Sequence, residues 1–188
     1  MNVDYPKRAS RRGRDPVARF GAIAWETVQT LVLAFLIAIL IRGVFLETYM
    51  VYGLSMEPSL HEGERLLVNK LVYRFRAPSP GEIVVFTEPG GARNLVKRVV
   101  ATAGQHVEMS NGQVFIDGVQ LAEDYLEYAG NDSLATRQVP ADSVFVLGDN
   151  RTDSQDSRYF GAVPLEYVNG RALIVFWPLT HLNILGSR

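Results

Sequence analysis

Residues Gly148 to Gly161 read G-D-N-R-T-D-S-Q-D-S-R-Y-F-G, and an apolar run, Val144 to Leu147, comes directly before them. The stretch holds three aspartates and two arginines, and it ends in two aromatic residues, Tyr159 and Phe160, that favour burial. A polar cluster after an apolar strand is commonly a solvated turn with Asx-type hydrogen bonds. The mixed charges and the aromatic end instead favour a buried polar network that holds a functional group from elsewhere in the chain.

The composition limits which kinds of site the chain can build. It has 188 residues, enough for one domain or one domain with an insertion, and its net charge of -1 gives no overall basic footprint for nucleic acid. The absence of cysteine excludes disulfides, thiol nucleophiles and cysteine-based zinc sites. Three isolated histidines, His61, His106 and His181, show no metal-ligand spacing. We therefore expect no cofactor, no metal and no nucleic-acid partner.

Residues 1–26 are the basic part of the chain. They contain six basic and three acidic residues, a net charge of +3, whereas the whole chain carries -1. We expect a basic tail on the cytoplasmic side of a membrane, disordered over residues 1–20. The alternative is an arm that binds nucleic acid.

Residues 27–46 form the longest apolar segment, T-V-Q-T-L-V-L-A-F-L-I-A-I-L-I-R-G-V-F-L. Twenty helical residues span about 30 Å, the thickness of a bilayer core. Two alternatives are a buried core helix and a cleaved secretory signal. No polar face balances the apolar residues, and no small-x-small cleavage pattern follows them. The segment therefore predicts an uncleaved transmembrane signal anchor in the cell (plasma) membrane, with the N-terminus cytoplasmic and residues 47–188 extracytoplasmic.

After residue 47 the pattern changes to short β-like runs separated by turn residues. Asn111-Gly112 and Asp117-Gly118 are strong two-residue hairpin signals. The sequence predicts a mainly β fold: an antiparallel β-sheet catalytic domain over residues 47–188, tethered by the transmembrane helix, with a small β subdomain inserted at about residues 104–140. The expected strands are 65–72, 82–87, 94–101, 105–109, 113–117, 143–147 and 171–177.

Ser55 lies in a short loop, Y-G-L-S-M-E-P-S-L over residues 52–60, close to the end of the apolar segment. A lone serine in a loop is usually structural. No histidine lies in a motif that suits a Ser-His-Asp triad, and no S-x-x-K motif starts at this serine. A serine can also be activated by a lysine, provided that the amine is neutral.

Lys97 is the lysine that fits this requirement. In the expected strand 94–101, alternation places Lys97 on the same face as Leu95 and Val99. Burial on an apolar face favours the neutral amine, as a general base requires. The alternative is an edge-strand lysine that prevents aggregation. Arg98 would point to the opposite face and pair with an acid.

Three motifs in this order, G-L-S-M-E-P-S-L, V-K-R-V-V-A-T-A-G and G-D-N-R-T-D-S-Q-D-S-R-Y-F-G, follow the apolar segment. Together they closely resemble the bacterial type I signal peptidases over residues 20–180. These are membrane-bound Ser-Lys serine endopeptidases that remove signal peptides from exported preproteins, so the resemblance implies signal peptides and membrane lipid as partners.

The resemblance implies a role for each matching residue. Ser55 would be the acylated nucleophile, and Lys97 the general base for acylation and deacylation. Ser154 would hydrogen-bond to the lysine amine and orient it, and Asp156 would support the same network. The implied structural ion pairs involve Arg98, Asp149, Arg151 and Arg158, and the implied substrate pockets, which accept small residues in an Ala-x-Ala pattern, involve Met50, Val51, Leu95 and Val96.

Some positions depart from the family pattern. The position two residues before Ser55 is Gly53, where many members have a serine or threonine that donates to the oxyanion. The backbone N–H of Ser55 would be one donor, and the second needs a substitute. Two rival interpretations are a Ser-Lys self-cleaving regulator, which would carry a DNA-binding domain, and a membrane-tethered β domain that binds a partner without catalysis.

Overall fold

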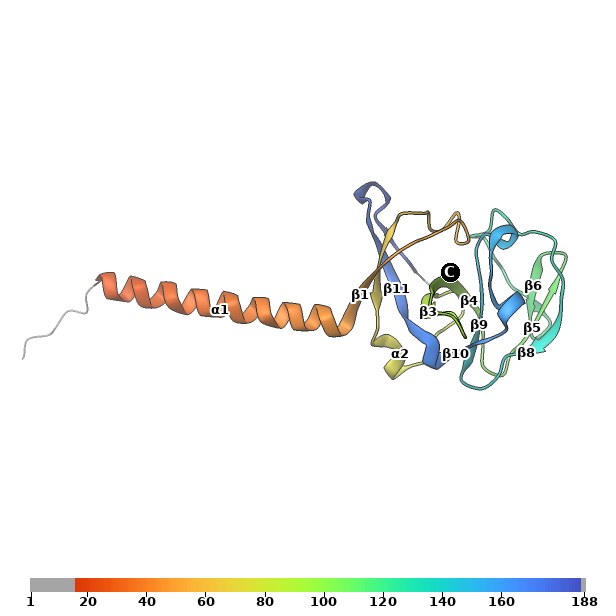
Figure 1. Ribbon diagram of the computed structural model, residues 1–188, viewed down its shortest axis with the longest axis horizontal. Helices are drawn as coiled ribbons and strands as arrows, with labels where there is room; N and C mark the ends of the chain where they lie inside the picture. The colour runs from red at the N-terminus through yellow and green to blue at the C-terminus, as the bar shows by residue number, and fades with distance from the viewer. Residues whose placement is uncertain (1–15, 187–188) are drawn as a thin grey trace, which may run out of the picture. The chain divides into compact units, whose positions relative to one another are not determined.

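The computed structural model describes residues 16–186, without the side chains of residues 16–22, 40–42 and 44. The chain divides into two compact units, residues 1–42 and residues 43–188. Every strand of residues 16–186 lies in the second unit, and all strand pairs are antiparallel (Figure 1). The predicted mainly β, antiparallel fold is therefore confirmed.

The helix α1 covers Pro16–Phe45. Its first residue is a proline, which suits the first helical position because its fixed φ is already helical. A backbone N–H at this position would have no partner within the helix, so proline loses no hydrogen bond there. The predicted helix at 27–46 lies inside α1 except for Leu46, which begins the first strand. Residues 1–15 of the predicted tail lie outside the described residues, and residues 16–26 are helical.

Among the residues that the structure describes, no helix is both long enough and apolar enough to span a membrane. The transmembrane character predicted for residues 27–46 is therefore not confirmed and stays a prediction.

The larger sheet has eight strands in the order β1-β2-β11-β3-β4-β9-β10, with β12 paired to β11. Residues of β2 alternate between buried and more accessible, as in a strand with one covered face. In β3, β4 and β9 the buried residues are continuous; in β3 they pack alternately into two different clusters, because both faces of this strand are covered. The strands are β1 (Leu46–Met50), β2 (Arg65–Asn69), β3 (Ile83–Thr87), β4 (Asn94–Thr102), β9 (Ser143–Leu147), β10 (Val163–Pro164), β11 (Val168–Trp177) and β12 (Asn183–Ile184).

The smaller sheet has the strand order β7-β6-β5-β8. Its strands are β5 (His106–Ser110), β6 (Gln113–Ile116), β7 (Val119–Gln120) and β8 (Leu134–Gln138). Both predicted hairpins are present: Asn111 and Asp117 adopt φ of 48° and 51°, and each is followed by a glycine with positive φ. The sheet occupies residues 106–138, whereas the predicted domain division at 104–140 stays a prediction.

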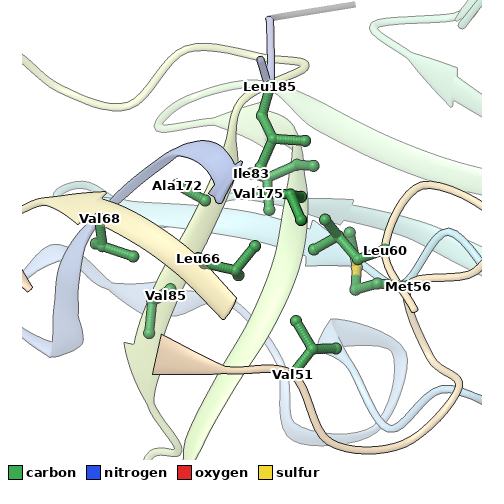
Figure 2. Packing of buried hydrophobic residues seen from close by; sticks show 10 residues of the cluster. All are labelled: Val51, Met56, Leu60, Leu66, Val68, Ile83, Val85, Ala172, Val175 and Leu185. Atoms are coloured by element: carbon green, nitrogen blue, oxygen red, sulfur yellow. The ribbon is translucent and has the colours of Figure 1, made fainter. Parts of the chain in front are cut away.

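Three clusters of buried apolar side chains hold the second unit together. One of them, drawn in Figure 2, joins Val51, Met56 and Leu60 of the loop after β1 to the larger sheet. A second cluster joins Val100 and Phe145 of the larger sheet to residues of β5 and β6, so the two sheets share a core. Short helical turns lie in some of the connections between strands: α2 (Val72–Phe75), α3 (Ser157–Phe160), and the 3-10 turns Arg151–Asp153, Leu165–Tyr167 and Leu179–His181.

Candidate active site

Ser55 lies in the loop that connects β1 to β2. Three buried side chains of this loop, Val51, Met56 and Leu60, insert into the core on both sides of the serine (Figure 2). The carbonyl oxygen of Ser55 also accepts a hydrogen bond of 3.1 Å from the backbone N–H of Asn150. The loop is therefore held both by the core and by the polar stretch 148–161, while the serine itself remains partly accessible.

Lys97 lies in the middle of β4, opposite Val84 of β3, and its side chain is buried. Its Nζ donates to Ser55 Oγ at 2.6 Å and to the carbonyl oxygen of Val96 at 3.0 Å. Burial lowers the pKa of Lys97 from 10.5 to about 8; the negative charges of Asp156 and Asp149 oppose this change, and the positive charge of Arg158 adds to it.

The geometry allows proton transfer between this serine and this lysine. The distance of 2.6 Å is within hydrogen-bond reach. A lysine whose pKa is near 8 is partly neutral at neutral pH, and only the neutral amine can accept a proton. The pair can therefore generate a serine nucleophile without a histidine or a metal ion.

Asp156 is the centre of the polar stretch, and it is completely buried. Its Oδ2 accepts from the Ser154 hydroxyl at 2.7 Å and from the Gly148 N–H at 3.0 Å. Arg158 donates to both of its carboxylate oxygens at 2.8 Å. Asp156 also caps the N-terminus of α3 by accepting from the Arg158 N–H. The carboxylate therefore connects the two ends of the stretch.

Ser154 differs from its predicted contact. Among the hydrogen bonds of residues 16–186, its hydroxyl donates to Asp156 and none joins it to the Lys97 amine. The single donor proton of Ser154 goes to the Asp156 carboxylate, and the Lys97 amine donates to Ser55 and Val96 instead of to the Ser154 oxygen. Tyr159 differs too, because its side chain is exposed and its ring lies beside the Arg158 guanidinium rather than in the core.

Gly148 lies where the two loops of the site come closest. A Cβ atom at this position would lie 2.2 Å from Ser154 Oγ and 2.5 Å from the carbonyl oxygen of Ser55. Both distances are shorter than any real contact of this kind, so only glycine lets the loop that carries Ser55 approach the loop that carries Ser154.

Arg98 lies on the opposite face of β4 from Lys97. Its guanidinium forms a buried bidentate pair with Asp149, at 2.8 Å and 2.7 Å. It also lies 3.9 Å from the centre of the Tyr125 ring and donates to Ser59 Oγ at 3.1 Å. The pair thus connects β4, the loop after Ser55 and the start of the polar stretch, on the face of β4 opposite Lys97.

The two arginines of the stretch 148–161 have partners in a separate loop. Arg151 pairs with Glu123, and Arg158 pairs with Asp132 in addition to Asp156. Glu123 and Asp132 were not among the predicted site residues. They lie in an irregular segment between two strands, where nothing in the local sequence pattern distinguishes an ion-pair partner from a solvated acid.

A cavity of about 530 Å³ opens beside the serine and the lysine. All four predicted pocket residues line it: Met50, Val51, Leu95 and Val96. The end of β1 and the beginning of β4 form its walls, and Tyr49, Tyr52 and Arg93, which were not predicted, line it too. Residues 94–97 of β4 pair with β3 on one side, whereas β9 pairs with β4 only from Arg98 onward. The backbone of β4 therefore has one free edge along this cavity.

Gly53, which departs from the family pattern, and the buried acid Glu64 both lie in the loop that carries Ser55. The Gly53 N–H donates to Glu62 Oε1 at 3.3 Å, so it points to a carboxylate. Glu64 is buried, accepts from the His61 N–H at 3.0 Å and lies 2.9 Å from His181 Nδ1. Within the described part of the chain, no group of three histidine, cysteine or acidic side chains could hold a metal ion.

Comparisons with known proteins agree on one family. The family model described as "Signal peptidase, peptidase S26" matches residues 24–177. The "Probable signal peptidase I-2" of Synechocystis is 39% identical over 166 residues, which cover 85% of this chain and 76% of that protein. The "Signal peptidase I" of Leptolyngbya laminosa is 37% identical over 169 residues (86% and 83%), and that of Bacillus amyloliquefaciens is 36% identical over 167 residues (82% and 86%).

Proposed function

Because the chain belongs to the signal peptidase family, peptidase S26, it is a serine endopeptidase, and we propose that it cleaves signal peptides from exported preproteins through Ser55 and Lys97. The observation that carries this proposal is the hydrogen bond of 2.6 Å between Lys97 Nζ and Ser55 Oγ beside the cavity. Cleavage occurs after residues in a small-x-small pattern, as in Ala-x-Ala.

Acylation begins with the neutral amine of Lys97. About a tenth of amines with a pKa near 8 are neutral at pH 7. The neutral Nζ takes the proton of Ser55 Oγ while the oxygen attacks the carbonyl carbon of the scissile peptide bond. The resulting ammonium then gives this proton to the leaving nitrogen, so the peptide C–N bond breaks and an acyl-serine ester remains.

Deacylation uses the same lysine again. Once the new N-terminus has left, the neutral Nζ accepts a proton from water, and the hydroxide oxygen attacks the ester carbonyl. The ammonium returns a proton to Ser55 Oγ, which restores the serine and releases the signal peptide with a free carboxylate. The backbone N–H of Ser55 is the proposed donor to the oxyanion in both steps. Because Gly53 has no side chain, the second donor must be another group.

The cavity supports recognition of an extended peptide. The free edge of residues 94–97 can pair with a substrate strand through main-chain hydrogen bonds, which require no particular side chain. Side chains of an extended strand point alternately to opposite sides, so every second side chain of the substrate enters the cavity and contacts Val51 and Leu95. Small residues at alternate positions fit this arrangement.

Cleavage of a preprotein with an Ala-x-Ala site tests the proposal. S55A and K97A should lose at least about a thousandfold in kcat, whereas the matched controls S110A and K70A, which change exposed residues of the same types, should cleave like the wild type. Replacement of the last substrate alanine by leucine should prevent cleavage. Undiminished cleavage by S55A or by K97A would show that the proposed residues are not the catalytic ones.

The proposal includes attachment to the cell membrane through residues 27–46, with residues 47–188 on the outer side. Its support is the sequence: twenty residues with one charge, Arg42, close to the end. In addition, the described side chains of α1 include exposed large apolar residues such as Leu31, Phe35 and Ile39. The full chain should remain in the membrane fraction after alkaline carbonate extraction. Recovery of the full chain in the soluble fraction would refute the anchor and leave the proposed chemistry unaffected.

A further inference from the structure

The loop between β7 and β8, residues 121–133, contacts each of the three arginines around the site. The Tyr125 ring lies 3.9 Å from the Arg98 guanidinium. Two contacts reach Arg151: the Glu123 carboxylate pairs with its guanidinium, and the Tyr128 carbonyl oxygen accepts from its N–H at 3.0 Å. Asp132 pairs with Arg158. We call residues 121–133 the β7–β8 loop.

Arg158 is the arginine that pairs with the buried Asp156, and all five of its guanidinium N–H groups have acceptors. Two donate to the carboxylate of Asp156 at 2.8 Å each. Two more donate to the carbonyl oxygens of Arg151 at 2.8 Å and of Ser154 at 3.2 Å. The fifth donates to the carboxylate of Asp132. Among these acceptors, only Asp132 lies outside the stretch 148–161.

Asp132 is itself held in place by the hairpin between β5 and β6. Its carbonyl oxygen accepts from the Gly112 N–H at 2.9 Å, and the hydroxyl of the next residue, Ser133, accepts from the Asn111 N–H at 3.3 Å. The hairpin and the β7–β8 loop lie close together, since a Cβ at Gly112 would lie 2.4 Å from the carbonyl oxygen of Gly130. Although the Asp132 carboxylate is half-exposed, its backbone is therefore well defined.

We propose that Asp132 is a positioning residue for the proposed reaction: it fixes the Arg158 guanidinium, which fixes Asp156, and Asp156 in turn holds Gly148 and Ser154 against the loop that carries Ser55. The inference rests on the proposed function, because it treats Lys97 as the base. It adds a residue outside the three motifs that define the site, and it gives the smaller sheet a part in catalysis.

The charges around the two groups determine the expected effect. Burial lowers the pKa of Lys97 to about 8, while Asp156 and Asp149 raise it and Arg158 lowers it. Asp149 is paired with Arg98. Arg158 in turn faces Asp156, Asp132 and Tyr159. When the negative charge of Asp132 is removed, the positive charge of Arg158 is less compensated, so the charged form of Lys97 becomes less favourable and its pKa falls further.

The test compares D132N, D132E and the matched control D124N in the full chain. Asp124 is an exposed acid in the same loop, and no hydrogen bond or ion pair of the described residues involves its side chain. The kcat and KM of preprotein cleavage are measured between pH 6 and pH 10. Lys97 is also titrated by NMR of ¹³Cε-labelled lysine, which is practical because the chain has only three lysines, Lys7, Lys70 and Lys97.

For D132N we expect a kcat about three- to tenfold lower with little change in KM, because Ser55 is displaced from the base by a fraction of an ångström. The Lys97 titration and the acid limb of the pH profile should both move to lower pH by about 0.3 unit, a small change because Asp132 is half-exposed to screening water. D132E keeps the charge and should keep the titration, but its longer side chain should still lower kcat. D124N should match the wild type.

Three results would overturn the inference. One is a D132N enzyme with the kcat and the Lys97 titration of the wild type. The second is an equal effect of D124N, which would indicate a general charge effect. The third is a loss of kcat in D132N with an unmoved Lys97 titration, which would indicate a purely structural role. The NMR titration does not depend on activity, so it remains decisive even if S55A and K97A cleave normally and the proposed function fails.

Discussion

Replacement of Lys97 by methionine should abolish activity and, at neutral pH, stabilise the fold. The burial of Lys97 lowers its pKa from 10.5 to about 8. Each pKa unit corresponds to ~1.4 kcal/mol, so keeping this amine buried costs about 3 kcal/mol at pH values where it is charged in the unfolded chain and the folded one. Methionine is similar in length and apolar, so K97M removes this cost and leaves little cavity.

The direction of the pH dependence follows from proton counts. Between pH 8 and pH 10.5 the unfolded chain binds a proton at Lys97 that the folded chain has largely lost. The free energy of unfolding of the wild type therefore rises with pH across this window. In K97M, residue 97 binds no proton and adds nothing to this rise. The stability advantage of K97M should be largest below pH 8 and should fall by about 2 kcal/mol between pH 7 and pH 10.

The assay is guanidinium unfolding of the full chain in a mild detergent, at pH 7 and at pH 10. K70M is the matched control, since Lys70 is exposed and paired with Glu47 at the surface. Its stability difference from the wild type should change little with pH. A stability difference between K97M and the wild type that is the same at both pH values would refute the buried, pKa-shifted lysine, and with it the electrostatic basis of the proposed general base.

Three further substitutions test other parts of the site. D149N leaves the Arg98 charge buried with only a neutral partner, so the free energy of unfolding should fall by about 3 kcal/mol, measured by denaturant unfolding; an unchanged value would contradict the pair's structural role. G148A forces the Ser55 and Ser154 loops apart, so kcat should fall about a hundredfold; wild-type kcat would show that the loops adjust freely. L95W fills the cavity, so KM for a preprotein should rise about tenfold while the NMR titration of Lys97 stays in place; an unchanged KM would exclude the cavity as the substrate site.

Most strands could be predicted because their burial follows a simple pattern. All seven expected strands are present, with ends that differ by up to three residues. The exceptions have physical reasons. In β8 four of five residues are exposed, so its sequence has no alternation to detect. β1 follows α1 without a break, and its first residue, Leu46, reads as the last residue of the apolar segment. Strands of two residues, such as β7, depend on their partners rather than on their own sequence.

The candidate site could be predicted only in part. An apolar strand position made Lys97 a plausible base, and the structure brings it to Ser55 across 42 positions of sequence. The pairing of Arg98 with an acid follows from the same alternation, and the acid is Asp149. Glu123 and Asp132 could not be found in this way, because it is the path of the β7–β8 loop that brings their carboxylates to Arg151 and Arg158.

Lys97 and Arg98 are consecutive residues of β4, and each cation has its partners on one face only. A strand that slipped by one residue would exchange their faces. In one direction the slip would place Arg98 at the serine and Val99 opposite Asp149, and in the other it would place Val96 at the serine and Lys97 opposite Asp149. A length change between Thr87 and Asn94 that shifted β4 by one residue would therefore separate Lys97 from Ser55 and Arg98 from Asp149 together. Chains with such a length change should fail to fold rather than accumulate as folded, inactive enzyme.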